Sequence, residues 1–291
     1  MNVWVAAVVA IIVISAAYSY LKQLSFSLVV SVVCVTSFAL LLISAGTPFY
    51  GDSETMYQLE FIPKDLTDPG RLYTVLTSMY THASITHLMV NILVIAFIGM
   101  AFEQRIGTRP YILLYFLTGL CGTLVFAGFN WGDDFIAVVG ASGAISGILG
   151  AFVRMFPHER MTLLFFPMMP MPLWVMIAGY LALQVVFLSG SSNVAVEAHV
   201  GGLAAGYLIA PFVAKLPLRN RVKRSVSLPA LRKLATTPEL ETIMRRIEDE
   251  SIPDVRSVWV EHFLSTAKCP HCGAKLKTRN EGIMCERGHM L

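Results

Sequence analysis

Long apolar runs separated by short polar segments dominate the first three quarters of the chain. A bilayer core of about 30 Å requires about 20 apolar residues per helix. Seven segments approach that length, at residues 3–21, 26–46, 83–103, 110–129, 139–156, 171–189 and 195–214. The pattern therefore predicts an all-α polytopic membrane protein with seven membrane-spanning helices.

The chain changes character near residue 215. Charged residues make up 14% of the 291 residues, against about 25% in soluble proteins, and more than half of them lie in 216–291. This distribution excludes a single water-soluble domain, a disordered chain and a disulfide scaffold, and it predicts a small soluble tail. Within the tail, Thr237-Pro238-Glu239 is typical of a helix start, and a second short helix is expected after Pro253.

The loops differ in their content of Lys and Arg, which predicts the orientation, because cytoplasmic loops carry an excess of positive charge. One set of loops holds ten basic residues, namely Lys22, Arg105, Arg109, Arg154, Arg160, Lys215, Arg219, Arg221, Lys223 and Arg224. The other set holds Lys64 and Arg71. We therefore expect the amino terminus outside and the tail in the cytosol. The tail has 14 basic and 9 acidic residues, which suits an anionic leaflet and requires no nucleic acid.

Four polar residues lie where a membrane tolerates few of them. Ionisable side chains inside a bilayer cost several kcal/mol and are usually paired or functional. The third span begins with His87 and Asn91, the fifth with Ser142 and the seventh with His199. All three spans run from outside to inside, so the four residues share one depth just below the outer surface. A further ionisable residue, Glu103, ends the third span.

Glycines indicate close contact between the fifth and seventh spans. Gly140, Gly143, Gly147 and Gly150 recur along one side of the fifth, and Gly202 and Gly206 form a Gly-x-x-x-Gly pair in the seventh. Small residues allow two helix backbones to approach closely. This contact would bring Ser142 within reach of His199. The alternative is that the glycines merely pack a bundle and Ser142 bonds its own backbone.

The residue types favour nucleophilic catalysis. A serine hydroxyl is a weak nucleophile until a neighbouring base removes its proton, so we interpret Ser142 as the nucleophile and His199 as the general base. No carboxylate lies at their depth, which predicts a dyad. The backbone N–H of Ser142 and the side chains of His87 and Asn91 would stabilise the oxyanion. Ser146, one turn deeper, is the rival nucleophile.

These motifs resemble those of the rhomboid family of intramembrane serine proteases. Gly140-Ala141-Ser142-Gly143 is similar to the family's Gly-x-Ser-Gly. The second core helix of the family is matched by His82-x4-His87-x3-Asn91 with Gly99 and Glu103, and the sixth by Ala198-His199-x2-Gly202-x3-Gly206. The resemblance covers about residues 26–215. It implies a rhomboid-like six-helix bundle plus one N-terminal helix. The Trp-Arg pair that is common in the family's first loop is missing here, and only Gly70-Arg71 lies near the end of that loop.

The resemblance implies an intramembrane serine endopeptidase that needs no cofactor for catalysis. It would cut single-span membrane proteins near the outer ends of their helices, within the lipid bilayer. Substrates would enter laterally past 171–189, with residues 189–193 as a mobile cap. One alternative is an inactive rhomboid-like protein that binds membrane helices. A proton-relaying transporter is a third reading, and it predicts ionisable groups through the full bilayer depth. The simplest expected location is a prokaryotic cell membrane.

The end of the tail carries a metal-binding pattern. Cys269 and Cys272 form a Cys-x2-Cys pair, and Cys285 and His289 follow, which gives four ligands for a tetrahedral Zn²⁺. The pattern resembles a zinc ribbon, and a cytosolic position would keep its thiols reduced. The Zn²⁺ would be structural, and a cytosolic partner of the ribbon is unknown.

The sequence thus suggests four segments. They are an extra N-terminal transmembrane helix at 1–22, a six-span protease core at 23–215, a cytosolic helical linker at 216–265 and the zinc ribbon at 266–291.

Overall fold

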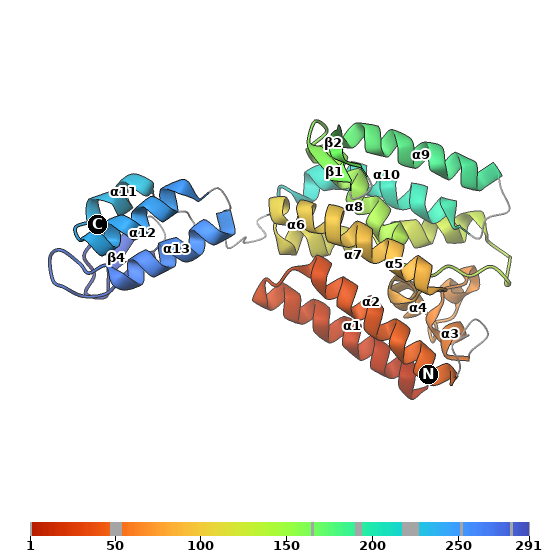
Figure 1. Ribbon diagram of the computed structural model, residues 1–291. Coiled ribbons are helices and arrows are strands. Elements are labelled where there is room, and N and C mark those ends of the chain that lie inside the picture. Colours follow the sequence, from red (N-terminus) through yellow and green to blue (C-terminus); the bar gives the residue numbers. More distant parts are fainter. Residues whose placement is uncertain are drawn as a thin grey trace. The chain divides into compact units, whose positions relative to one another are not determined.

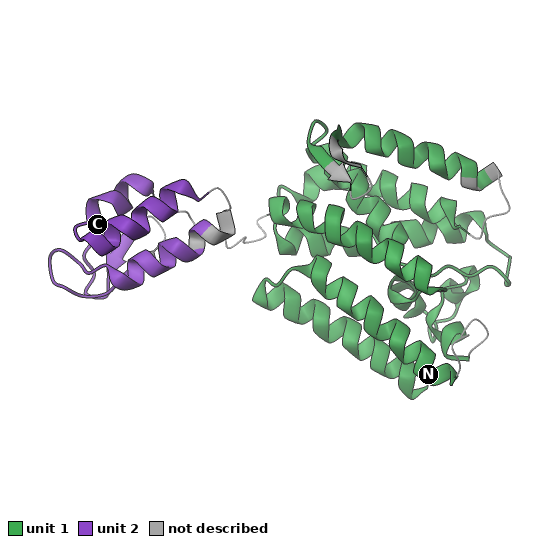
Figure 2. Cartoon of the chain, viewed as in Figure 1, with its two compact units in different colours: residues 1–220 green, residues 221–291 purple. Residues whose placement is uncertain are grey.

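The computed structural model describes residues 2–46, 54–163, 166–189, 194–216, 227–250, 253–279 and 282–290. The chain forms two compact units, unit 1 at residues 1–220 and unit 2 at residues 221–291 (Figure 2). The four segment boundaries expected from the sequence remain a prediction.

All seven apolar segments are helices in unit 1 (Figure 1). They form α1 (Val3–Lys22), α2 (Phe26–Ala45), α5 (Ile85–Val94), which continues through the π-helical turn η3 (Ile95–Gly99) into α6 (Met100–Ile106), α7 (Thr108–Phe129), α8 (Ser142–Met155), α9 (Leu173–Ser189) and α10 (Val196–Val213). Among the described residues, five helices are apolar and long enough to cross a membrane, with α5 to α6 counted as one, and α8 and α9 are shorter. The prediction of a helical, multi-span membrane fold is confirmed.

Between the second and third predicted spans, residues 54–80 form short helices, which the sequence did not predict. They are α3 (Glu54–Leu59), η1 (Pro63–Thr67), α4 (Thr74–Thr77) and η2 (Ser78–Tyr80). A buried ion pair holds this segment together: the carboxylate of Asp65 accepts from Arg71 Nε at 3.0 Å and from the Thr74 hydroxyl at 2.9 Å. Arg71 also lies over the ring of Tyr57, 4.7 Å from its centre. Arg71 therefore anchors the segment that precedes α5.

A second unpredicted element follows α8. Strands β1 (Arg160–Leu163) and β2 (Phe166–Pro172) pair antiparallel, with Arg160 opposite Pro172. Arg105 of α6 reaches Glu159, just before β1, in an ion pair of 2.6 Å. The hairpin thus connects α8 to α9 while one charged contact ties its start to α6.

Glu103, the unexplained acidic residue at the end of the third span, caps the start of α2. Its side chain is buried and its two oxygens accept four hydrogen bonds. The donors are the Ser25 hydroxyl at 2.9 Å, the Phe26 N–H at 2.6 Å, the Ser27 N–H at 2.8 Å and the Thr108 hydroxyl at 2.9 Å. The first N–H groups of a helix lack partners within it, and a carboxylate there is favoured by the helix dipole. Glu103 therefore joins α6, α2 and α7 for a structural reason.

Replacing Glu103 with Gln is expected to destabilise unit 1 by about 2–4 kcal/mol. The amide nitrogen of Gln would replace one acceptor oxygen, so the buried hydrogen-bond donors that now bind that oxygen would face another donor. The melting temperature of the purified chain in detergent measures the effect. The exposed Glu54, replaced by Gln, is the control and should melt like the parent chain. Equal melting of both variants would contradict the role of Glu103.

In its described residues, unit 2 combines three helices with one hairpin around a small core. The elements are α11 (Leu228–Leu234), α12 (Pro238–Asp249), α13 (Pro253–Thr266), β3 (Leu276–Arg279) and β4 (Gly282–Cys285). The Thr237 hydroxyl accepts from the Leu240 N–H at 3.3 Å and caps α12, so the helix start expected from the sequence is present. Phe263 of α13 and Ile283 of β4 are fully buried in the shared core. Helices and hairpin therefore fold as one body.

Candidate active site

Ser142 is the first residue of α8, and the backbone before it is fixed by two distant segments. Val138 exchanges backbone hydrogen bonds with Phe61, at 2.8 and 3.2 Å, and the Gly140 N–H donates to Ser78 O at 2.8 Å. Gly140 has a φ of +114°, a region open to glycine but strained for other residues. The chain can therefore turn sharply into α8 and present Ser142 at its start.

Ser142 and His199 meet although 57 positions separate them in the chain. Nε2 of His199, in the first turn of α10, lies 2.8 Å from Ser142 Oγ. This distance is that of a hydrogen bond between a hydroxyl and an imidazole nitrogen. The pair can pass a proton from the serine oxygen to the ring, which is the requirement for an activated serine.

Two residues of α9 complete this group, and the sequence interpretation missed both. Gln184 is buried, and its Oε1 lies 3.0 Å from Nδ1 of His199. The Tyr180 hydroxyl, one turn earlier, lies 2.6 Å from Ser146 Oγ. A buried amide in an apolar run was the available signal, since such a group is retained only when it is hydrogen-bonded.

The hydrogen bonds of the Ser146 hydroxyl join it to residues other than His199. Its hydroxyl donates to the Ser142 carbonyl oxygen at 2.7 Å and pairs with Tyr180. Of the two serines on this face of α8, Ser142 is therefore the one beside an imidazole.

His87 and Asn91 lie one turn apart on α5, with different environments. A β-carbon on Gly140 would come within 2.7 Å of His87 Nε2, so the imidazole packs directly against the backbone two residues before Ser142. The Asn91 amide is buried and donates to the His87 carbonyl oxygen at 2.8 Å, within its own helix. His82 is fully buried, its ring centre 5.1 Å from that of His87, and its two nitrogens have no hydrogen-bond partner among the described residues.

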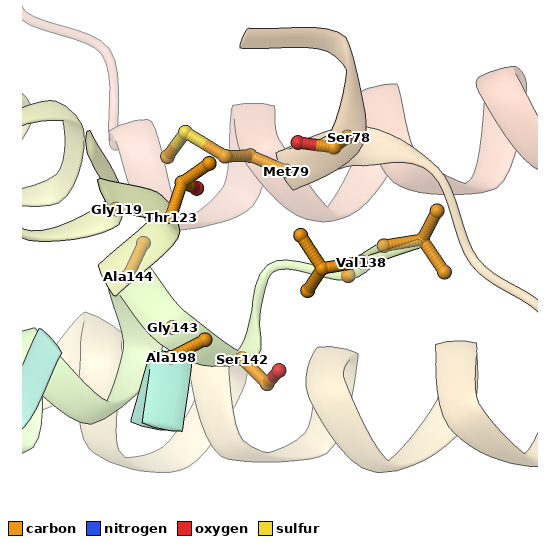
Figure 3. A pocket seen from close by; sticks show the side chains of 11 residues that line it. Ser78, Met79, Gly119, Thr123, Val138, Ser142, Gly143, Ala144 and Ala198 are labelled. Carbon is orange, nitrogen blue, oxygen red and sulfur yellow. The ribbon is translucent and has the colours of Figure 1, made fainter. Parts of the chain in front are cut away.

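A small pocket of about 10 Å³ opens beside Ser142 (Figure 3). Ser78 and Met79 come from η2, Val138 from the loop before α8, and Thr123 from α7. Its volume is close to what one water molecule needs, and the hydroxyls of Ser78, Thr123 and Ser142 supply polar lining. The residues next to the serine thus leave little free space.

Glycines set the distance between α8 and α10. A β-carbon on Gly202 would overlap the carbonyl oxygen of Gly143, and one on Gly206 would overlap that of Gly147. On the other side of α8, Thr118 of α7 donates to Ala144 O at 3.3 Å. The two backbones therefore pack in direct contact, which positions Ser142 and His199 at hydrogen-bonding distance.

The Gly206→Ala variant is expected to push α8 and α10 apart and to lower the rate at which a serine-directed fluorophosphonate probe labels Ser142 by about 100-fold, since a displacement near 1 Å at a reacting pair costs about that much. Overpacking should also cost about 1–3 kcal/mol of stability. The labelling rate measures the first effect and thermal melting the second. Gly128→Ala in α7 is the matched control, because a β-carbon there meets nothing within 4 Å. A Gly206→Ala chain that is labelled at the parental rate would refute this account.

The four predicted metal ligands of unit 2 converge. The ligand atoms of Cys269, Cys272, Cys285 and His289 lie within 4.8 Å of one another. Two sulfur atoms, those of Cys272 and Cys285, are 3.7 Å apart, and His289 Nδ1 is 3.4 Å from the Cys285 sulfur. Bonds of about 2.3 Å at tetrahedral angles would place ligand atoms about 3.7 Å apart. The cluster could therefore hold a metal ion.

The surroundings of Cys285 favour its thiolate. Gly273 and Gly288 have φ of +68° and +91°, and their N–H groups donate to the carbonyls of Cys269 and Cys285 at 2.8 and 3.0 Å, which makes two tight turns. Burial raises the pKa of the Cys285 thiol, but the backbone N–H groups of His289 and Arg287, together with side-chain hydrogen bonds to Cys272 and Cys269, lower that pKa to about 6. A thiolate is the form that binds a metal.

The mobile cap expected at residues 189–193 lies almost entirely outside the described residues. Of this segment, the structure describes the backbone of Ser189 at the end of α9. The helix behind it, α9, is described and carries Tyr180 and Gln184.

Comparison with known proteins matches the family model described as "Rhomboid domain" to residues 69–216. Rhomboid protein 1, mitochondrial, of Saccharomyces cerevisiae is 29% identical over 160 residues, covering 52% of this chain and 44% of that protein. RHOMBOID-like protein 5 of Arabidopsis thaliana is 30% identical over 161 residues, with coverage of 53% and 48%. Rhomboid protease GluP of Bacillus subtilis is 27% identical over 176 residues, with coverage of 60% and 32%. The matched regions thus span less than half of each relative.

Proposed function

The chain belongs to the rhomboid family, and from this premise we propose that it is an intramembrane serine endopeptidase. The observation that carries the proposal is the 2.8 Å contact between Ser142 Oγ and His199 Nε2 inside a bundle of apolar helices. A binding protein has no need of a base at the serine hydroxyl. The similarity to a relative named as a rhomboid protease supports the same conclusion.

In the proposed reaction, Ser142 Oγ attacks the carbonyl carbon of the substrate while its proton passes to His199 Nε2. The tetrahedral intermediate then collapses, and the same proton goes to the leaving amine. In the second half of the reaction, a water molecule deprotonated by His199 attacks the acyl carbon. The bond between Ser142 Oγ and the acyl group then breaks as His199 returns the proton to Ser142 Oγ. Both steps use Nε2 of His199, while Nδ1 lies 3.0 Å from Gln184 Oε1.

The oxyanion of the intermediate requires donors beside Ser142. We assign this role to the Ser142 backbone N–H and to the side chains of His87 and Asn91. The packing of His87 against Gly140 supports its part. Asn91 now donates to the His87 carbonyl, so its amide would have to rotate toward the substrate when the oxyanion forms.

We infer that the substrates are single-span membrane proteins. A transmembrane helix hides its carbonyls in internal hydrogen bonds, so a substrate must unwind locally before Ser142 reaches a peptide bond. Entry past α9 is the proposed route. The excess of Lys and Arg on one set of loops supports an outside amino terminus, a cytosolic unit 2 and cleavage near the outer ends of substrate helices. A prokaryotic cell membrane remains the simplest location.

For unit 2 we propose a structural Zn²⁺ held by Cys269, Cys272, Cys285 and His289. Three thiolates and one imidazole in a closed tetrahedral set are typical of structural zinc. The ion would stabilise the hairpin β3–β4 and take no part in peptide hydrolysis. A cytosolic partner of this ribbon is part of the same proposal.

The test of the enzymatic proposal uses the full chain reconstituted in lipid vesicles with a labelled single-span substrate. The expected result is one new product whose mass locates the cut near the outer end of the substrate helix, together with labelling of Ser142 by a fluorophosphonate probe. Failure of both cleavage and labelling across several substrates would instead support the inactive helix-binding alternative.

A further inference from the structure

Gln184 is an amide in the middle of the apolar helix α9, and its side chain is only 3% exposed. A primary amide in apolar surroundings costs several kcal/mol unless it is hydrogen-bonded. The contact that offsets this cost is the one between Gln184 Oε1 and His199 Nδ1, at 3.0 Å. Gln184 therefore touches the proposed base on the nitrogen that faces away from Ser142.

The contact has a consequence for the position of the imidazole proton. A neutral histidine carries one N–H donor and one bare acceptor nitrogen. Nε2 must be bare to take the proton of Ser142, so the hydrogen has to be on Nδ1. The amide oxygen of Gln184 is an acceptor only, and it is satisfied only when Nδ1 carries that hydrogen. The two hydrogen bonds of His199 are thus compatible with one tautomer, the one that can act as a base.

The same face of α9 makes a second polar contact. Tyr180 lies one turn before Gln184, and its hydroxyl is 2.6 Å from Ser146 Oγ, which in turn donates to the Ser142 carbonyl oxygen at 2.7 Å. Residues four apart share a helix face. One face of α9 therefore contacts both helices that carry the dyad: α8 through Tyr180, and α10 through Gln184.

We propose that Gln184 is a positioning residue that fixes the tautomer and rotation of the His199 ring. The activity of the dyad would therefore depend on the position of α9 against α10. The inference rests on the proposed function, in which His199 is the base. An outward movement of α9 would separate Gln184 from Nδ1 and leave the ring free to take the wrong tautomer. Once His199 has accepted the serine proton, Gln184 still accepts from Nδ1–H, so the imidazolium keeps a partner without a buried carboxylate.

Two variants test the role of the acceptor. Gln184→Met has a similar size but no side-chain oxygen, and it is expected to lower kcat by about 10- to 100-fold with KM nearly unchanged, since a buried N–H loses its acceptor. Gln184→Glu keeps an acceptor and should retain most of the activity. The acid limb of the pH–rate profile of this variant should move to higher pH, because a carboxylate stabilises the protonated His199 ring. Leu183→Met, at a position 47% exposed, is the matched control and should keep the parental kcat.

The tautomer provides a readout that a merely structural residue would not change. The measurement is an NMR spectrum of the chain labelled with 15N-histidine, in which the His199 signals are identified by their loss in the His199→Asn variant. We expect the His199 ring of the parent chain to carry its hydrogen on Nδ1. Gln184→Met should shift hydrogen to Nε2. Parental kcat in Gln184→Met, or a loss of activity with an unchanged ring tautomer and a lower melting temperature, would overturn the proposal. If the parent chain does not cleave, the enzymatic proposal fails, while the tautomer comparison still tests Gln184.

Discussion

Replacing Ser142 with alanine is expected to abolish cleavage, with a loss of at least about 10⁴-fold in kcat, the scale found when one member of a serine–base unit is removed. His199→Ala should have an effect of the same order, because Ser142 then lacks the base that lies 2.8 Å from its oxygen. The double variant should be no worse than either single one, since the two residues act as one unit. Product quantified by mass spectrometry in reconstituted vesicles measures all three.

Ser146→Ala is the discriminating companion variant. Its hydroxyl bonds to Tyr180 and to the Ser142 carbonyl oxygen, and not to His199. We expect its effect to be far smaller than that of Ser142→Ala, because only support of α8 is lost. If Ser146→Ala eliminated cleavage and probe labelling while Ser142→Ala retained them, the nucleophile would be Ser146.

The apolar helices could be predicted because they depend on local sequence. A run of about 20 apolar residues specifies a helix that crosses the bilayer, and each of the seven predicted runs is helical. Counting crossings predicts the direction of each span and one shared layer for Ser142 and His199. The glycines on α8 and α10 indicate which two helices bring these residues together, and the 2.8 Å contact agrees with that.

Contacts made by single polar side chains between distant segments were harder to predict. Gln184 is four residues after Tyr180 in an otherwise apolar helix, and nothing local specifies that this face of α9 turns toward His199. Glu103 was recognised as unusual, but its partners, the N–H groups that begin α2, lie 76 and 77 positions away. The small helices of residues 54–80 and the β1–β2 hairpin were missed because tertiary contacts, such as that of Asp65 with Arg71, stabilise segments too short to show a periodic pattern.

Removal of the metal is expected to unfold the hairpin end of unit 2. In small domains, the apparent free energy of binding a structural Zn²⁺ is roughly 10–16 kcal/mol. Because the site does not exist in the unfolded chain, this binding energy also stabilises the fold. Cys285 is fully buried in the core that α11, α12 and α13 share with the hairpin, so removal of the proposed ion would destabilise this core where the hairpin packs against the helices. The Cys285→Ala variant and the chelated parent chain should both lose protection of backbone amides in residues 268–289, measured by hydrogen exchange.

Metal content and activity decide between this role and others. The parent chain should contain one Zn²⁺ by elemental analysis, and Cys285→Ala close to none. Cys121→Ser is the matched control, because Cys121 lies in α7, in unit 1, and outside the four-ligand cluster. It should keep both the metal and the amide protection. Because the ion is proposed to be structural, the chelated chain should still label at Ser142. A parent chain without zinc, or a hairpin whose amides stay fully protected after chelation, would contradict the zinc assignment. Loss of Ser142 labelling on chelation would show that the metal supports the active site as well.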